Sequence, residues 1–302
     1  MLSALAMSGC GEVADGTAHP DIVGATHRYA QVGETRWHYL EGGEGDAVVF
    51  LHGLPETSFA WRRAFNWLTV GNRVVAVDLE GFGLSRTTST DFSVAAMADR
   101  LLAFLEAIEV DRFHLVGHDF GAIIGARTAS QAGDRLLSYA HVSGPLLRYD
   151  LTRNPDFRDF RNDPDSVPDL LRNPEIFVRR TYEMGVVGGP AALDQPMIDR
   201  YTADLENWDA LTSIAQYFSQ LDVSSDWTLG PDAAANWGAI QAPVLFVLGG
   251  RDLMLPLEEF HDIETIVPPL DRLAVLEGAG HYPHEEDPIA FGDALYDFLQ
   301  GH

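Results

Sequence analysis

Short apolar runs alternate with amphipathic segments from about residue 28 to residue 144. The runs predict a hairpin turning at Gly33 and Glu34, and then strands at residues 47–53, 72–81, 113–119 and 138–144. The amphipathic segments predict helices at residues 59–69, 94–109 and 121–132. Strands that are apolar along their whole length and are separated by helices are typical of a parallel sheet covered on both faces.

This alternation stops between residues 145 and 237, where no convincing strand can be identified. The segment instead predicts helices at residues 169–185, 194–205 and 208–221. After Pro243 the alternation resumes, with two more apolar strands and with helices near residues 256–266 and at 288–299. We therefore expect an α/β core made of residues 26–144 and 238–302, with residues 145–237 inserted as a helical cap over the carboxyl ends of the strands.

Composition excludes several classes of protein. The 302 residues include 45 acidic and 20 basic side chains, all of the latter arginine, which gives a net charge of −25. A field of that sign repels phosphate backbones and argues against nucleic acid as a partner. No run approaches the roughly 18 apolar residues that a membrane-spanning helix requires, so we expect no transmembrane segment.

The single cysteine, Cys10, makes an intrachain disulfide impossible. It follows the short apolar stretch of residues 1–9 and precedes a polar stretch, an order that resembles the end of a bacterial lipoprotein signal. Two localisations stay open, an exported periplasmic lipoprotein with a lipid anchor at Cys10 and a cytoplasmic protein. In both cases we expect residues 1–25 to form a flexible N-terminal segment outside the fold.

The strongest candidate for chemistry is the sequence GHDFG at residues 117–121, between a predicted strand and a helix rich in small residues. It has the form of a nucleophile elbow, Gly-x-Ser-x-Gly, with Asp119 where serine usually stands. The sequence HGLP at residues 52–55 ends an earlier strand, and Asp252 and His281 follow two later ones. The order nucleophile, acid, histidine is that of a hydrolase triad.

These motifs resemble the α/β-hydrolase fold and, within it, the branch with an aspartate nucleophile: epoxide hydrolases and haloalkane or haloacetate dehalogenases. The resemblance covers residues 28–144 and 238–300. The segment HGLPETSFAWR is close to one common in epoxide hydrolases, and DLEGFGLS and GAGHYPHEEDP fit the wider superfamily. The resemblance implies a mostly parallel sheet with helices on both faces, an inserted helical cap, and hydrolysis of a small-molecule substrate without metal or organic cofactor.

An aspartate nucleophile favours attack on saturated carbon. A carboxylate that attacks an acyl carbon gives an anhydride, whereas displacement of oxygen or halide from saturated carbon gives an alkyl ester. Water activated by His281 can then cleave the ester on Asp119, with Asp252 orienting the imidazole. The backbone N–H groups of Leu54 and Phe120 would hold the oxyanion that forms. The expected electrophile is therefore an epoxide or a carbon–halogen centre.

The groups that would assist the leaving group favour the epoxide. Haloalkane dehalogenases usually carry a tryptophan after the nucleophile, and often an asparagine after the His-Gly pair, where this chain has Phe120 and Leu54. Fluoroacetate dehalogenases usually carry an arginine after the nucleophile, which this chain lacks. We expect an epoxide hydrolase that forms a vicinal diol, with a dehalogenase using the same triad and a non-catalytic ligand-binding member of the fold as alternatives.

Epoxide hydrolases typically protonate the opening oxygen with two cap tyrosines or with a His/Tyr pair. The stretch QYFSQ resembles the family segment that bears the second tyrosine; the strictest alignment places Phe218 there, with Tyr217 beside it. For the first donor, the sequence offers Tyr182 and, less favoured, Tyr149.

Several other side chains have a simpler expected place. We assign His52, Pro55, Trp61 and Phe218 to the wall of the substrate pocket. A tryptophan in the place of Trp61 is more often part of a core or a pocket wall than a specific contact. His118 is expected to be a packed or hydrogen-bonded neighbour of the nucleophile. The pattern His281-x-x-His284 followed by two glutamates superficially suggests a metal site, but we expect no metal. A homodimer stays open.

Overall fold

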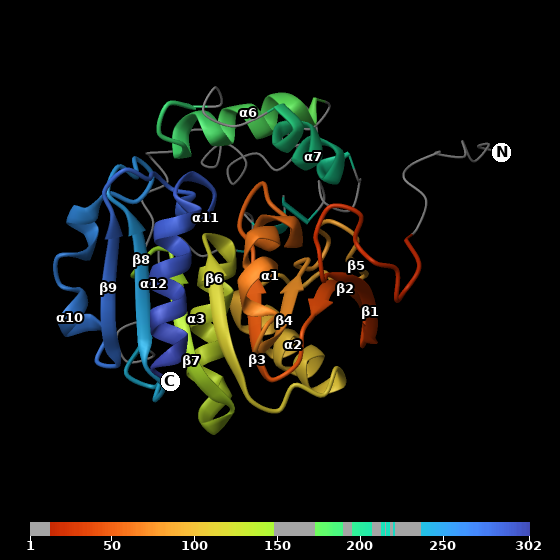
Figure 1. The fold of residues 1–302 in the computed structure, drawn as a ribbon, viewed down its shortest axis with the longest axis horizontal. Helices are drawn as coiled ribbons and strands as arrows, with labels where there is room; N and C mark the ends of the chain where they lie inside the picture. The colour runs from red at the N-terminus through yellow and green to blue at the C-terminus, as the bar shows by residue number, and fades with distance from the viewer. Residues whose placement is uncertain are drawn as a thin grey trace.

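The computed structural model describes residues 13–147, 173–189, 195–206, 213–214, 216–217, 220 and 237–302 (Figure 1). Within these residues the centre is a nine-stranded sheet of order β1-β2-β4-β3-β6-β7-β8-β9, with β5 paired to β2. The strands are β1 Thr26–Val32, β2 Thr35–Gly42, β3 Asp46–Leu51, β4 Asn72–Val77, β5 Arg86–Thr87, β6 Phe113–His118, β7 Leu136–Val142, β8 Val244–Gly249 and β9 Leu270–Leu276. The pairs of β2 with β1, β4 and β5 are antiparallel, and every pairing from β4 to β9 is parallel. The expected hairpin and mostly parallel sheet are therefore present.

Both faces of the sheet are buried, as the continuously apolar strands predict. Along β3, Val48 and Phe50 belong to one hydrophobic cluster, whereas Val49 and Leu51 belong to the other. The first cluster is covered by α1 (Arg62–Leu68) and α12 (Pro288–Gln300), and the second by α2 (Val94–Ala107) and α3 (Phe120–Ala132). Alternation along a strand thus places successive side chains in two separate cores.

The described helices of the expected cap lie across one end of the sheet, as Figure 1 shows for α6 (Pro174–Gly185) and α7 (Gln195–Leu205). The backbone N–H of His281, which follows β9, donates to the Gly185 carbonyl at 2.7 Å, so α6 contacts the carboxyl ends of the strands. Residues 148–172 and 221–236 lie outside the described residues, and the boundaries of the cap stay a prediction.

The described part of the N-terminal segment packs on the core, so the expectation that residues 1–25 lie outside the fold is wrong for residues 13–25. Ile22 and Ala25 are buried in the same cluster as α1, and Ala18 forms a bridge with the first residue of β1. The sequence gives little sign of this packing, because the segment holds few apolar side chains and one of the largest, Val23, is exposed. Cys10 lies outside the described residues.

One predicted helix at the C-terminal side differs in detail. The helix expected near residues 256–266 is two short ones, η6 (Leu257–Phe260) and α10 (Ile263–Ile266). Val267 follows α10 and precedes Pro268, and the residue before a proline is disfavoured in helical conformation, so the helix ends at Ile266. A short helix, α11 (Pro283–Glu286), follows His281. None of the described helices is both long and apolar enough to cross a membrane.

A row of histidines ties the N-terminal segment to the sheet. The His19 ring stacks on His27 with centroids 4.9 Å apart, His27 Nδ1 lies 2.9 Å from His38 Nε2, and His38 Nδ1 lies 2.6 Å from Asp78 Oδ2. Burial, together with the charge of Arg200, lowers the pKa of His19 to about 4. His19 is therefore neutral in the folded protein at neutral pH.

We predict that His19→Asn reduces the acid sensitivity of the fold. Because the folded pKa lies below the value of 6.5 for an exposed histidine, the unfolded chain takes up the proton first. The stabilisation is complete above pH 6.5 and is lost as the pH falls towards 4. Between pH 7 and pH 5 the free energy of unfolding should fall by about 2 kcal/mol less in the variant than in the unchanged protein, as denaturant titrations can measure.

A control in the same segment is Val23→Ala, because the Val23 side chain is 84% exposed. It should change neither the free energy of unfolding nor its pH dependence. The same acid sensitivity in His19→Asn and the unchanged protein would contradict the prediction.

Candidate active site

Asp119 lies on a strained turn between β6 and α3. Its φ is +50°, a region that non-glycine residues rarely adopt, and this strain marks candidate functional positions. The flanking glycines allow the turn: a Cβ on Gly117 would lie 2.3 Å from the Gly121 carbonyl oxygen, and one on Gly121 would lie 2.4 Å from the Leu51 carbonyl oxygen. The turn therefore has the geometry of the predicted nucleophile elbow.

Three side chains that the sequence analysis singled out meet at the carboxyl ends of β6, β8 and β9. His281 Nε2 lies 3.3 Å from Asp119 Oδ2, and His281 Nδ1 lies 2.8 Å from Asp252 Oδ2. Asp252 is held in turn, because its Oδ1 accepts the backbone N–H groups of Met254 and Leu255 at 2.8 and 3.0 Å. The Asp119 side chain is 16% exposed, whereas His281 and Asp252 are almost fully buried. The nucleophile candidate is thus the member that a ligand can reach.

The second oxygen of Asp119 faces the loop after β3. Leu54 donates its backbone N–H to Asp119 Oδ1 at 2.9 Å. A Cβ on Gly53 would lie 2.6 Å from the same oxygen, so only glycine lets the loop come this close. Leu54 therefore occupies the place of one expected oxyanion donor, and the contribution of Phe120 stays a prediction.

The charges around His281 set its protonation. Burial alone would lower the pKa of His281, but the Asp252 carboxylate and the hydrogen bond with Asp119 outweigh it and raise the pKa to about 10. Burial would likewise raise the pKa of Asp119, but the hydrogen bond from His281 and the charges of His281 and His118 lower it. At neutral pH the free protein therefore holds an ionised Asp119 beside a His281 imidazolium.

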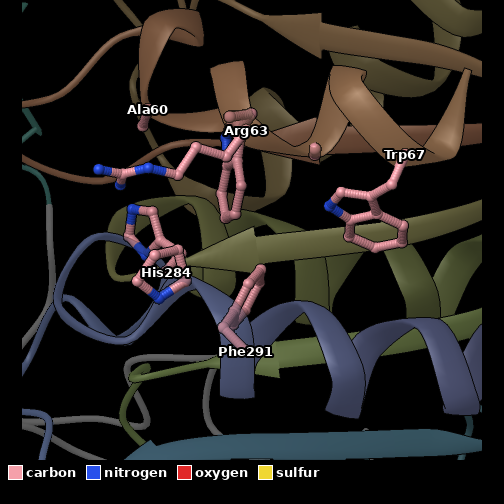
Figure 2. Close-up of a pocket in the computed structure, with 8 residues that line it drawn as sticks. Ala60, Arg63, Trp67, His284 and Phe291 are labelled. Carbon is pink, nitrogen blue, oxygen red and sulfur yellow. The ribbon is translucent and has the colours of Figure 1, made fainter.

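Two residues assigned to the substrate pocket lie elsewhere. His52 is fully buried; its Nε2 accepts the Leu79 N–H at 3.0 Å and its Nδ1 lies 2.8 Å from the Gly53 carbonyl oxygen, so the ring supports the loop. Trp61 lines a small pocket between α1 and α12, together with Arg63, Trp67 and His284 (Figure 2). No member of the Asp119–His281–Asp252 triad lines that pocket. These assignments failed because position along the chain does not tell which side of a loop faces the ligand.

The two cap tyrosines are buried near the triad without a hydrogen bond to it. The Tyr182 ring lies 4.5 Å from that of Tyr282, and its hydroxyl has no hydrogen-bond partner among the described residues. The Tyr217 hydroxyl donates to the Glu80 carbonyl at a long 3.5 Å, and its ring meets Phe120 edge-on at 5.6 Å. Tyr149 and Phe218 lie outside the described residues.

Sequence reasoning missed a buried cluster behind the nucleophile. Glu56, His118 and His284 bring one potential metal ligand each within 4.8 Å of one another. Each of these atoms already takes part in a 2.8 Å hydrogen bond within the set, so hydrogen bonding alone accounts for the arrangement. The sequence predicts His118 as a packed or hydrogen-bonded neighbour and places His284 only within a superficial metal pattern. No spacing links Glu56 to either histidine, so the cluster as a whole was not predicted.

Comparisons with known proteins agree with this architecture. The sequence model of the alpha/beta hydrolase family matches residues 48–294. The chain is 26% identical over 303 residues to epoxide hydrolase 1 of Siraitia grosvenorii, covering 87% of this chain and 94% of that protein. A Vigna radiata epoxide hydrolase mutant superposes with a TM-score of 0.76 at 25% identity, over 92% of this chain and 99% of the other. A bacterial membrane phospholipase A superposes with a TM-score of 0.74 at 25% identity, over 92% and 86% of the two chains.

We predict that Asp119→Asn lowers the pKa of His281. The amide keeps the shape of the carboxylate but removes one of the two negative charges that hold the imidazole protonated. A titration of the His281 ring nitrogens by ¹⁵N NMR should show the midpoint falling from about 10 towards neutrality. The control variant Asp99→Asn, at an exposed position, should leave the His281 midpoint unchanged. An equal midpoint in Asp119→Asn and in the unchanged protein would show that Asp119 does not raise the pKa of His281.

Proposed function

The chain belongs to the alpha/beta hydrolase family, and from within that family we propose that it hydrolyses epoxides to vicinal diols through a covalent ester on Asp119. One observation carries the proposal: an ionised aspartate, not a serine, stands at the tip of the strained turn with His281 beside it. Such a carboxylate is suited to displacement at saturated carbon and poorly suited to acyl transfer. The named epoxide hydrolases among its relatives support the same reading.

The first step is ring opening by Asp119. Its Oδ1 is held by the Leu54 N–H, which leaves Oδ2 as the oxygen that attacks. A bond forms from Oδ2 to one epoxide carbon while the bond from that carbon to the epoxide oxygen breaks. The released oxygen takes a proton from an acid of the cap, and the product of the step is a hydroxyalkyl ester of Asp119.

The second step is hydrolysis of that ester. Water attacks Cγ of Asp119 while His281 Nε2 takes its proton, and the negative charge develops on Oδ1. The Leu54 N–H, and in our proposal that of Phe120, stabilise this charge. Collapse breaks the bond between Cγ and the original Oδ2, which takes the proton from the His281 imidazolium and leaves as a hydroxyl of the diol. The second proton of the water then passes from the Asp119 carboxyl to His281, which restores the free protein. The water oxygen stays on Asp119.

The change of charge on Asp119 prepares His281 for the second step. In the free protein the charges of Asp252 and Asp119 keep the imidazole protonated, so it cannot act as a base. Esterification removes the charge of Asp119, the pKa of His281 falls, and the ring releases its proton to solvent. This proton balances the one that the acid of the cap gave to the epoxide oxygen. The base therefore becomes active only after the ester has formed, which sets the order of the two steps.

Tyr182 is the better-placed donor for the released oxygen. It lies one turn before Gly185, whose carbonyl accepts the His281 N–H, and its hydroxyl is buried without a partner among the described residues. Leaving a buried hydroxyl unpaired costs about 1–3 kcal/mol, which a substrate oxygen can offset. Burial raises the pKa of Tyr182 well above the usual value, so the hydroxyl keeps its proton until the alkoxide develops. Tyr217 is the second candidate.

We predict that His281→Gln traps the ester. Without its base the variant should open the ring and then stop, because water is no longer activated. Intact-protein mass spectrometry after exposure to small epoxides should show an added mass equal to the whole epoxide. The double variant with Asp119→Asn should show no adduct.

The same experiment separates the alternatives. An adduct equal to a haloalkane minus hydrogen halide, with none from epoxides, would assign the chain to the dehalogenases. A folded His281→Gln variant that gives no adduct from broad panels of both would favour a ligand-binding protein without turnover.

We also predict that Tyr182→Phe slows ring opening about 100-fold, the usual contribution of a general acid. The rate of adduct formation in the His281→Gln background measures this step directly. Tyr201→Phe is a matched control, because Tyr201 packs against Tyr182 with centroids 6.0 Å apart but its hydroxyl already donates to Glu285 at 3.1 Å. An unchanged rate of adduct formation in Tyr182→Phe would exclude Tyr182 as the donor and leave Tyr217 as the candidate.

A further inference from the structure

Behind the nucleophile lies a hydrogen-bonded chain of three buried side chains. His118 Nδ1 lies 2.8 Å from Glu56 Oε2, and His284 Nε2 lies 2.8 Å from Glu56 Oε1. Glu56 and His118 have no exposed surface, and His284 is 3% exposed. The triad mechanism uses none of these three groups.

Counting donors gives the charge of His118. Burial would raise the pKa of Glu56, but His284 and His118 hold it well below its usual range, so the carboxylate is ionised and can only accept hydrogen bonds. The other ring nitrogen of His118, Nε2, lies 2.9 Å from the backbone carbonyl oxygen of His281, which is also an acceptor. Both nitrogens of His118 therefore carry a proton, and the ring is an imidazolium.

His284 completes the chain as a second hydrogen-bond donor to Glu56. Its Nε2–H points at Glu56, and its Nδ1 has no partner among the described residues. The ring stacks on Trp61 with centroids 4.7 Å apart and reaches the small pocket between α1 and α12 (Figure 2). Within this chain of bonds the His118 cation is paired with the Glu56 anion, and His284 binds the other oxygen of the anion.

A buried ion pair is a poor device for stability alone, because desolvation of the two charges offsets most of their attraction. The position of this pair suggests a different role, which is to connect the loops around the proposed reaction centre. Glu56 follows the oxyanion-hole loop, His118 precedes Asp119 in the chain, and His284 follows His281 by three residues. The chain of bonds thus joins the three loops that hold the proposed reaction centre.

We propose that Glu56, His118 and His284 form a positioning unit that keeps a fixed positive charge next to Asp119 and anchors the backbone of His281. The inference rests on the proposed function, because it explains how Asp119 stays an ionised nucleophile. His118 acts through its charge on Asp119 and through the N–H donated to the His281 carbonyl; it does not touch the substrate.

Other groups also face the two carboxylates and must be separated from this effect. Asp119 is faced by His281, His118, Tyr282 and the Leu54 N–H. Glu56 is faced by His118, His284, His52, the Gly53 N–H and the hydroxyls of Tyr182, Tyr201 and Tyr282. Among these only His281 and His118 supply a positive charge to Asp119. Replacing His281 by glutamine therefore isolates the contribution of His118.

The test compares His281→Gln with the double variant that adds Glu56→Gln. Without the negative charge of Glu56, nothing stabilises the second proton on the His118 ring. His118 then no longer supplies a positive charge to Asp119, and the pKa of Asp119 rises. The acid midpoint of adduct formation with a small epoxide should therefore move to higher pH by about one unit or more, with a roughly tenfold loss of rate below the midpoint. His284→Phe, which keeps the ring stacked on Trp61, should give a smaller shift in the same direction because Glu56 remains charged.

A matched control is Glu80→Gln in the same background. Glu80 is also a buried carboxylate paired with a cation, Arg100 at 2.8 Å, but it lies outside the chain of bonds. The Glu80→Gln substitution should lower the free energy of unfolding without moving the acid midpoint of adduct formation. Adduct formation with the same midpoint in the Glu56→Gln and parent proteins would overturn the positioning unit and leave the proposed function intact.

A second readout needs no turnover and uses the unchanged protein. The ¹⁵N resonances of the His118 ring, assigned by comparison with His118→Gln, should show two protonated nitrogens at pH 7. In Glu56→Gln one of the two should lose its proton. A ring with a single N–H in the unchanged protein would overturn the inference, whether or not epoxides react. Absence of any adduct with a doubly protonated His118 would instead overturn the proposed function alone.

Discussion

The turn at Asp119 depends on the close approach of three backbone segments, and most of the site follows from that approach. Gly117, Gly121 and Gly53 leave space where any side chain would meet backbone or the carboxylate within 2.7 Å. The positive φ of Asp119 costs about 1–3 kcal/mol, and such strain persists only when the surroundings fix it. Packing of the sheet therefore offsets the strain of the turn, and the result is a partly exposed carboxylate held between a backbone N–H and an imidazole.

Around this turn, charges of opposite sign alternate through the interior. Asp252, His281, Asp119, His118 and Glu56 follow one another as anion, cation, anion, cation, anion in the free protein. Each member is stabilised by its neighbours, so neutralising one changes the proton affinity of the next. Esterification of Asp119 is such a change, which makes the proton on His281 a consequence of the first chemical step.

Much of the fold and the triad could be predicted from local patterns. Residues 47–53 and 113–119 are apolar strands by inspection, and a glycine-flanked aspartate between strand and helix identifies the elbow. Glu56 could not be found in this way, because its partners His118 and His284 lie 62 and 228 residues away and only the fold brings them together. The same limit applies to Trp61, whose side of the loop was misjudged, and to His19, whose burial depends on β1 and β2.

The bond between the Gly185 carbonyl and the His281 N–H gives the cap helix α6 a second role. The bond joins a helix of the cap to the chain segment that carries the proposed base, so the position of the cap and the position of the imidazole are not independent. A substitution that displaces the C-terminal end of α6 is therefore expected to disturb His281 as well, even if it contacts neither the ligand nor the triad.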